Sequence, residues 1–178
     1  MVIKRLGWAN LLTLTRLLLL APMLYCVSLQ LWGAASLVFV AAVVTDIADG
    51  RVARALGEAS TRGGLFDHTV DALFVAASLG AGAWLGLVNP VLPPLILLAF
   101  LQYALDSRAH AGRALRASKL GRYNGITYYI LLGVVVITRA IGFEWLLAEN
   151  VAGWLLVAAT GLSMLDRALA HRTVLDSP

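Results

Sequence analysis

Long apolar runs, separated by short polar or turn-forming segments, leave this chain few folds to adopt. The first runs from about Asn10 to Trp32, close to the roughly 20 residues that a helix needs to cross a bilayer. Because lipid offers the backbone no hydrogen-bond partners, such runs cross a membrane as helices. Hydrophobic residues make up 60% of the 178 residues and charged residues only 13%, unlike a soluble domain. The sequence therefore predicts an all-α membrane protein.

We expect six transmembrane helices in a single domain over residues 1–178, preceded by a short interfacial segment in which Trp8 lies at headgroup depth. The first apolar run is too long for the hydrophobic region of a signal peptide, so we expect it to be retained. The predicted spans run from about Asn10 to Trp32, Gly33 to Ala53, Gly64 to Leu87, Leu95 to Leu105, Tyr123 to Ile141 and Val151 to Leu169.

Basic residues fall in alternate connections between these spans, and this pattern predicts the orientation of the chain. The basic connections hold Lys4 and Arg5; Arg51, Arg54 and Arg62; Arg108, Arg113, Arg116, Lys119 and Arg122; and Arg167 and Arg172. The opposite side holds Arg139 with Glu144 and Glu149, two acids that we expect to be solvated. By the positive-inside bias, both termini face the cytoplasm, in a cell (inner) membrane. Because this topology and anionic lipid headgroups explain the net charge of +4, we expect no nucleic-acid partner.

Four of the ten acidic residues are aspartates that lie in one window, at the predicted cytoplasmic ends of the second and third spans. Asp46 and Asp49 are three residues apart, and Asp67 and Asp71 are four apart, so each pair shares a helix face. Carboxylates at a membrane boundary cost free energy unless a partner binds them, and hard oxygen ligands suit Mg²⁺ or Mn²⁺, with Ca²⁺ also able to bind. The sequence therefore predicts a divalent-metal site. His68 lies off the acidic face, so we expect a surface contact for it rather than metal ligation.

Small residues and an arginine separate the two acidic pairs. Gly50, Ala53 and Gly63 remove side-chain bulk where a ligand must come close, and Arg54 offers a planar fork for phosphate oxygens. The window therefore predicts a metal site that takes a phosphate-bearing ligand.

The whole window resembles the signature of the CDP-alcohol phosphotransferases, also called CDP-alcohol phosphatidyltransferases. Its pattern Asp-x2-Asp-Gly-x2-Ala-Arg-x8-Gly-x3-Asp-x3-Asp is filled by Asp46, Asp49, Gly50, Ala53, Arg54, Gly63, Asp67 and Asp71. The resemblance implies an enzyme of phospholipid biosynthesis that transfers a phosphatidyl-type group from a CDP-linked lipid, such as CDP-diacylglycerol, to an acceptor alcohol and releases CMP. It also implies two divalent ions, an active site on the cytoplasmic side and a homodimer.

The same resemblance implies roles for individual residues. Asp46, Asp49 and Asp67 would be metal ligands, and Asp71 a ligand and the general base that takes the acceptor's proton. Gly50, Ala53 and Gly63 would flank the cytidine, and Arg54 would hold the pyrophosphate. The segment from Asn10 to Arg16 resembles the first helix of many bacterial members, which implies that Asn10 and Thr13 approach the nucleotide's phosphates. Arg16 either joins them or reaches the cytoplasmic headgroups.

The acceptor alcohol is not encoded in the acidic motif. The basic group Arg108, Arg113, Arg116, Lys119 and Arg122 either binds an acceptor phosphate or serves topology alone. The segment from Lys119 to Asn124 resembles the start of the fifth helix in phosphatidylglycerophosphate and cardiolipin synthases, which makes glycerol 3-phosphate the first choice. Inositol phosphate, serine and phosphatidylglycerol are the alternatives.

Two other classes of membrane protein also place acids in or near the bilayer. Intramembrane prenyltransferases carry Asp-rich motifs on helices far apart in a longer chain, whereas these four acids lie within one hairpin. An ion transporter should place acids near mid-membrane on several helices, and the remaining spans here are almost free of acid. Both classes are therefore remote alternatives.

Overall fold

The computed structural model describes residues 8–55, 61–109 and 119–175, and the side chains of 13–48, 64–105 and 120–169 within them. All secondary structure in these ranges is helical. The helices are α1 (Trp8–Ser28), α2 (Trp32–Ala55), α3 (Thr61–Trp84), α4 (Leu92–Ala109), α5 (Lys119–Ala140) and α6 (Leu146–Leu175). The all-α prediction is confirmed for the described residues.

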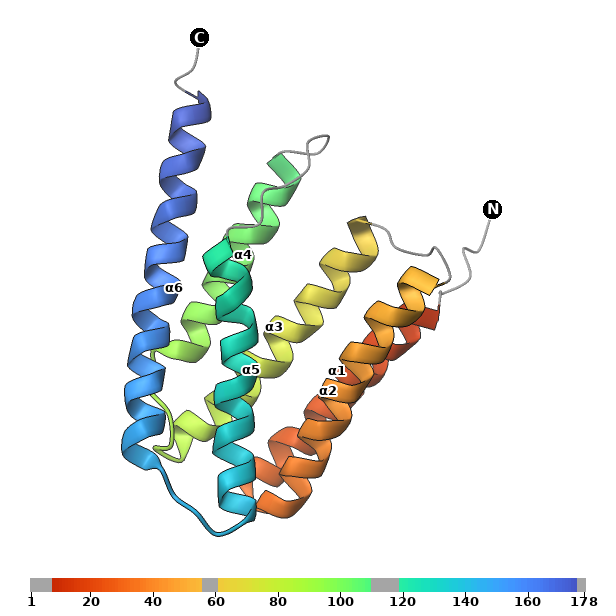
Figure 1. The fold of residues 1–178 in the computed structure, drawn as a ribbon, viewed down its shortest axis with the longest axis vertical. Coiled ribbons are helices and arrows are strands. Elements are labelled where there is room, and N and C mark those ends of the chain that lie inside the picture. The colour runs from red at the N-terminus through yellow and green to blue at the C-terminus, as the bar shows by residue number, and fades with distance from the viewer. Residues whose placement is uncertain (1–7, 56–60, 110–118, 176–178) are drawn as a thin grey trace.

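The helices form three antiparallel hairpins in one bundle (Figure 1). The turns between α1 and α2, α3 and α4, and α5 and α6 lie at one end, called here the turn end, and the start of α1 and the end of α6 lie at the other, called the terminal end. α3 packs against α1, α4 and α5, and α5 packs against α2, α3 and α6. The middle of the bundle is therefore built from α3 and α5.

Most helix boundaries lie within a few residues of the predicted spans. The end of the first helix differs, and the turn between α1 and α2 shows why. α1 ends at Ser28, and Gln30 adopts a left-handed φ of 56° that reverses the chain. The amide of Leu31 then donates to the carbonyl of Cys26 at 2.8 Å, and Trp32 already begins α2. An apolar run carries no mark for such a tight turn, so the predicted first span included Trp32, which begins the next helix.

The core forms where apolar faces of the helices meet, and one close contact needs a glycine. Met23, Phe74, Leu79 and Leu132 are at most 1% exposed. A Cβ at Gly133 would lie 2.9 Å from the ring of Phe39, so only glycine allows α5 to pack this closely on α2. This contact fixes the distance between the two helices that flank the site described below.

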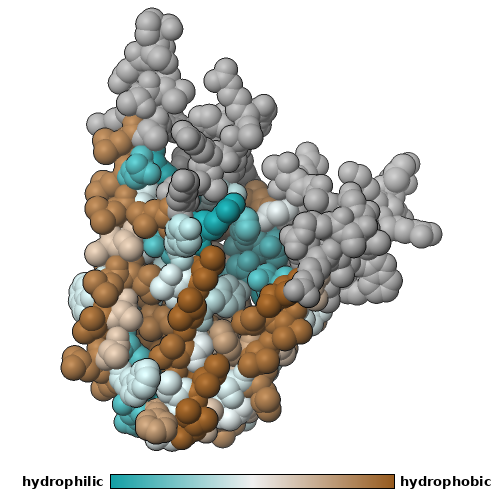
Figure 2. Space-filling view, viewed as in Figure 1, coloured by the Kyte–Doolittle hydropathy of each residue, from teal (hydrophilic) through white to brown (hydrophobic). Residues whose placement is uncertain are grey.

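Two of the described helices are long and apolar enough to cross a membrane, Leu120–Ala140 and Leu146–Leu169. Thr13–Ser28, Trp32–Ala48 and Leu92–Leu105 form shorter apolar helices. Large hydrophobic side chains also lie on the outside of the bundle, as the brown flanks in Figure 2 show. Leu147 is 81% exposed and Leu155 66% exposed on α6 alone.

The prediction that Glu149 is solvated is wrong, although Glu144 is exposed as expected. The Glu149 side chain is fully buried at the turn end, where its two oxygens accept from Arg139 at 2.7 and 2.8 Å. Arg139 also donates to the carbonyl of Val135 at 3.0 Å and lies over the ring of Trp32, 5.6 Å from its centroid. The acid is buried because the arginine on the neighbouring helix neutralises it.

Candidate active site

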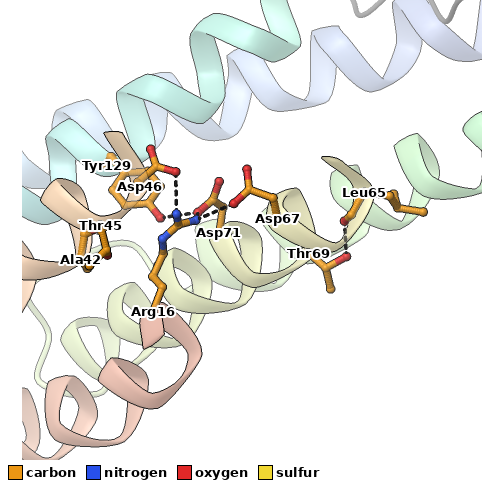
Figure 3. A network of polar contacts seen from close by, with 9 residues as sticks. All are labelled: Arg16, Ala42, Thr45, Asp46, Leu65, Asp67, Thr69, Asp71 and Tyr129. Atoms are coloured by element: carbon orange, nitrogen blue, oxygen red, sulfur yellow. Dashed lines mark hydrogen bonds and ion pairs between the residues drawn. The ribbon is translucent and has the colours of Figure 1, made fainter. Parts of the chain in front are cut away.

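Three acids from the predicted motif converge on one arginine at the terminal end of the bundle (Figure 3). Arg16 on α1 contacts Asp46 on α2 through Nη2 at 2.8 Å. Its Nη1 lies 3.1 Å from Oδ1 of Asp67 and also donates to Oδ1 of Asp71, both on α3. The sequence analysis predicted that these acids lie at the same depth in the membrane. In the structure, all three contact the guanidinium of Arg16.

Helix geometry explains this convergence. Asp67 and Asp71 are four residues apart near the start of α3, so their side chains lie one above the other on one face. Asp46 lies in the second half of α2, which packs beside α1, and α1 in turn packs on α3. The arginine therefore sits where the three helices face one another.

The burial of the four groups is unequal. The Arg16 side chain is fully buried, whereas those of Asp46, Asp67 and Asp71 are 41%, 28% and 22% exposed. The carboxylates thus form a polar surface beneath which the guanidinium lies. Full burial also excludes the alternative that Arg16 reaches the headgroups. Thr13, one turn earlier on α1, is 2% exposed and so lies in the same interior.

A tyrosine that the sequence analysis did not single out completes this cluster. The hydroxyl of Tyr129 on α5 donates to Oδ1 of Asp71 at 2.9 Å. Its ring stacks on Phe74, with centroids 6.4 Å apart and planes 11° apart, and lies 6.5 Å from the ring of Phe39. No sequence motif marks this tyrosine as a site residue. The one feature that could have indicated it is a hydroxyl within an apolar run that should face lipid or the core.

The oxygens of this cluster fit a hard divalent cation. One ligand atom each from Asp67, His68 and Asp71 lie within 4.8 Å of one another, and Asp46 faces the same arginine. Carboxylate oxygens in this number suit Mg²⁺, Mn²⁺ or Ca²⁺. The prediction that His68 lies off the acidic face is wrong, since its ring nitrogen lies in this group of ligand atoms. The side chain is exposed and also meets the ring of Tyr103 edge-on at 6.1 Å.

A cavity of about 440 Å³ extends from these acids into the space between α3, α4, α5 and α6. Asp46 and Asp71 line its side nearest the cluster, and Arg122 and Arg167 line it on α5 and α6. Hydrophilic side chains gather in a recess at this end of the molecule (Figure 2). The acids and two cations therefore face one space.

Arg167 was expected to serve topology, and the structure gives it a specific place. Its guanidinium lies over the ring of Tyr103, 5.2 Å from the centroid. A Cβ at Gly121 would lie 2.6 Å from Nη2 of Arg167, so a glycine at this position lets the arginine lie directly against α5. The glycine in the Lys119–Asn124 segment thus makes room for a cation that lines the cavity.

Several predicted site residues have side chains outside the described set, so their placement stays a prediction. They are Asn10, Asp49, Gly50, Ala53, Arg54, Gly63, Arg108, Arg113, Arg116 and Lys119. Of the predicted acceptor group, Arg122 is described, and it is an exposed residue of the cavity wall.

Comparison with known proteins decides the family. Residues 6–165 match the profile of the CDP-alcohol phosphatidyltransferases. The chain belongs to this family. It is 28% identical over 151 residues to CDP-diacylglycerol--glycerol-3-phosphate 3-phosphatidyltransferase 2 of Arabidopsis thaliana, covering 75% of this chain and 64% of the relative. It is 29% identical over 161 residues to CDP-diacylglycerol--glycerol-3-phosphate 3-phosphatidyltransferase 1, chloroplastic/mitochondrial, of Arabidopsis thaliana, covering 80% of this chain and 54% of the relative. The chain thus spans less than two thirds of either relative's length.

Proposed function

We propose that this protein transfers the phosphatidyl group of CDP-diacylglycerol to a hydroxyl of glycerol 3-phosphate and releases CMP. The convergence of Asp46, Asp67 and Asp71 beside a cavity carries the proposal. Family membership supports the reaction class, and the names of the two plant relatives support both substrates.

In this reaction the acceptor's hydroxyl oxygen forms a bond to the lipid-side phosphorus of the pyrophosphate. The bond from that phosphorus to the bridging oxygen breaks, and CMP leaves with the electron pair. Asp71 takes the proton from the hydroxyl. Divalent ions held by Asp46, Asp67, Asp71 and Asp49 would neutralise the pyrophosphate and stabilise the charge that develops on the leaving oxygen. Arg54 would bind the pyrophosphate, and Gly50, Ala53 and Gly63 would leave room for the cytidine.

The cavity supports an acceptor that carries its own phosphate. Arg122 and Arg167 line the same space as Asp71, and arginine binds phosphate oxygens through paired N–H donors. Gly121 brings Arg167 close to α5, so both cations lie by the start of that helix. Glycerol 3-phosphate would place its phosphate on these arginines and its hydroxyl toward Asp71.

The test is CMP release by the purified protein from CDP-diacylglycerol with Mg²⁺ or Mn²⁺. Glycerol 3-phosphate, inositol phosphate, free inositol, serine and phosphatidylglycerol are compared as acceptors, and Asp46→Asn is the inactive control. We expect release that depends on glycerol 3-phosphate. Absence of release with every acceptor would refute the reaction, and a preference for free inositol would refute the acceptor and the role of the two arginines.

The orientation in the membrane is part of the proposal. All six helices would cross the bilayer, with both termini and the acidic site on the cytoplasmic side of the cell (inner) membrane. The apolar outer surface and the alternation of basic connections support this arrangement. Cysteine labelling tests it, with Ala59→Cys in a Cys26→Ala background, because Cys26 is the one native cysteine. Labelling of Ala59→Cys from the external side would contradict it. The homodimer implied by family resemblance stays a prediction.

A further inference from the structure

Asp71 differs from the other two described acids of the cluster in the hydrogen bonds that it accepts. Within the described part of the chain, Asp46 and Asp67 each contact Arg16, whereas Oδ1 of Asp71 accepts from both Arg16 and Tyr129. The same described residues donate no hydrogen bond to its other oxygen, Oδ2. One oxygen of Asp71 is therefore anchored on two sides, and the other remains as an acceptor.

The two anchors hold Asp71 in different ways. The guanidinium of Arg16 is shared among three carboxylates, so it does not by itself fix the rotation of any one of them. The hydroxyl of Tyr129 is placed by a ring that stacks on Phe74 and lies beside Phe39. Because a tyrosine side chain has two χ angles and this ring packs against two others, its hydroxyl has little freedom to move.

The position of Tyr129 in the fold makes this contact specific. α5 packs on both α2 and α3, the helices that carry the acids, and Gly133 one turn later lets it approach α2 closely. Tyr129 and Asp71 both line the cavity in which Arg122 and Arg167 lie. The hydrogen bond therefore joins the wall of the cavity to the one acid that the reaction needs as a base.

We propose that Tyr129 is a positioning residue whose hydrogen bond to Oδ1 holds the Asp71 carboxylate with Oδ2 available to the metal site and to the acceptor's proton. This inference rests on the proposed function for its kinetic consequence. Hydrogen-bond partners of ligating carboxylates matter because they fix the orientation of the ligand, and their loss changes activity or metal affinity by roughly 10–100-fold. A shift of a reacting group by about 1 Å has an effect of similar size.

The test is Tyr129→Phe, which removes the hydroxyl and keeps the ring that packs on Phe74. We expect kcat to fall about 10–100-fold, while the KM values for donor and acceptor stay within about threefold because the hydrogen bond that is removed is the one to Asp71. Mn²⁺ affinity, measured by calorimetry without substrates, should also weaken. Tyr25→Phe, the same change at a 63% exposed position on α1, is the control for the substitution itself.

A second comparison separates positioning from stability. Tyr128→Phe removes the neighbouring hydroxyl, which lies 2.5 Å from that of Thr160, and so measures the thermal destabilisation caused by losing a buried phenol hydroxyl on α5. The inference is overturned if Tyr129→Phe retains wild-type kcat and Mn²⁺ affinity, or if donor KM, acceptor KM and unfolding temperature change together with kcat. If the wild-type protein releases no CMP, the proposed function fails, and unchanged Mn²⁺ affinity in Tyr129→Phe would still refute the positioning contact.

Discussion

Removing one partner of the Arg139–Glu149 pair should destabilise the protein strongly, although the pair lies far from the candidate active site. Glu149→Ala would leave the guanidinium of Arg139, whose side chain is 5% exposed, without the carboxylate that now accepts two hydrogen bonds from it. The carbonyl of Val135 and the ring of Trp32 would remain as its partners, and neither carries a negative charge.

The size of this effect follows from burial. Breaking a buried ion pair by removing one partner costs about 3–5 kcal/mol, because the remaining charge is left without compensation. For a chain of 178 residues this corresponds to a fall in unfolding temperature of roughly 6–20 °C. Replacing both residues by apolar ones of similar volume, Arg139→Met with Glu149→Leu, should leave stability at the wild-type level or raise it by about 1–4 kcal/mol, because no charge is then left buried alone.

Thermal unfolding of the purified protein in detergent measures these differences, and the two single variants with the double variant form a cycle. Glu144→Ala is the matched control, since Glu144 is an exposed acid in the connection just before α6, whose first turn holds Glu149. If Glu149→Ala destabilises the protein no more than Glu144→Ala, or if the double variant loses as much as the two single variants added together, the pair does not act as a neutral buried unit and the reasoning fails.

Three further predictions concern the site. Asp46→Asn should abolish CMP release and weaken Mn²⁺ binding, whereas Asp71→Asn should abolish release but spare donor binding. Kinetics measure the release, and calorimetry with CDP-diacylglycerol measures donor binding. Full activity of Asp71→Asn would contradict the general-base role. Arg167→Ala and Arg122→Ala should raise the KM for glycerol 3-phosphate about tenfold or more while the donor KM changes little, and equal changes in both would contradict acceptor binding. Arg16→Met should lower the unfolding temperature without metal and increase the stabilisation by added Mn²⁺, because three carboxylates lose the guanidinium that they share; identical Mn²⁺ shifts in variant and wild type would argue against this.

Local features of the sequence predicted the helices and the acidic cluster. Each apolar run forms most of one helix, so helix type and approximate length follow from composition. Asp67 and Asp71 share a face because of the helical repeat alone, and Asp46 joins them because its helix ends at the same side. The sequence analysis placed the four acids within one hairpin, whereas α2 and α3 belong to different hairpins and each packs on α1.

The partners of those acids could not be predicted in the same way, because they depend on helix packing. Tyr129 is 58 residues from Asp71, and its neighbour Tyr128 bonds to Thr160 instead, so sequence alone does not say which phenol reaches the site. Arg139 and Glu149 lie ten residues apart, in the last turn of α5 and the first turn of α6. The sequence analysis treated both charges as residues of an exposed connection, and so it missed that they form a buried ion pair. A charge in a connection is solvated by default, and only the geometry of the turn shows otherwise.

Arg16 and Arg139, two arginines whose side chains are buried, differ in charge balance, and that difference bears on where a cation should bind. Arg139 at the turn end meets one carboxylate, and both oxygens of Glu149 are bound, so this pair is neutral and complete. Arg16 at the terminal end meets three carboxylates, and these acids remain partly exposed beside a cavity. One guanidinium does not balance three carboxylates, and the repulsion among them must be relieved either by protonation or by a further cation. A divalent ion would relieve it without protonating Asp71, the proposed base, so the three described carboxylates around one guanidinium are a physical reason to expect metal binding there.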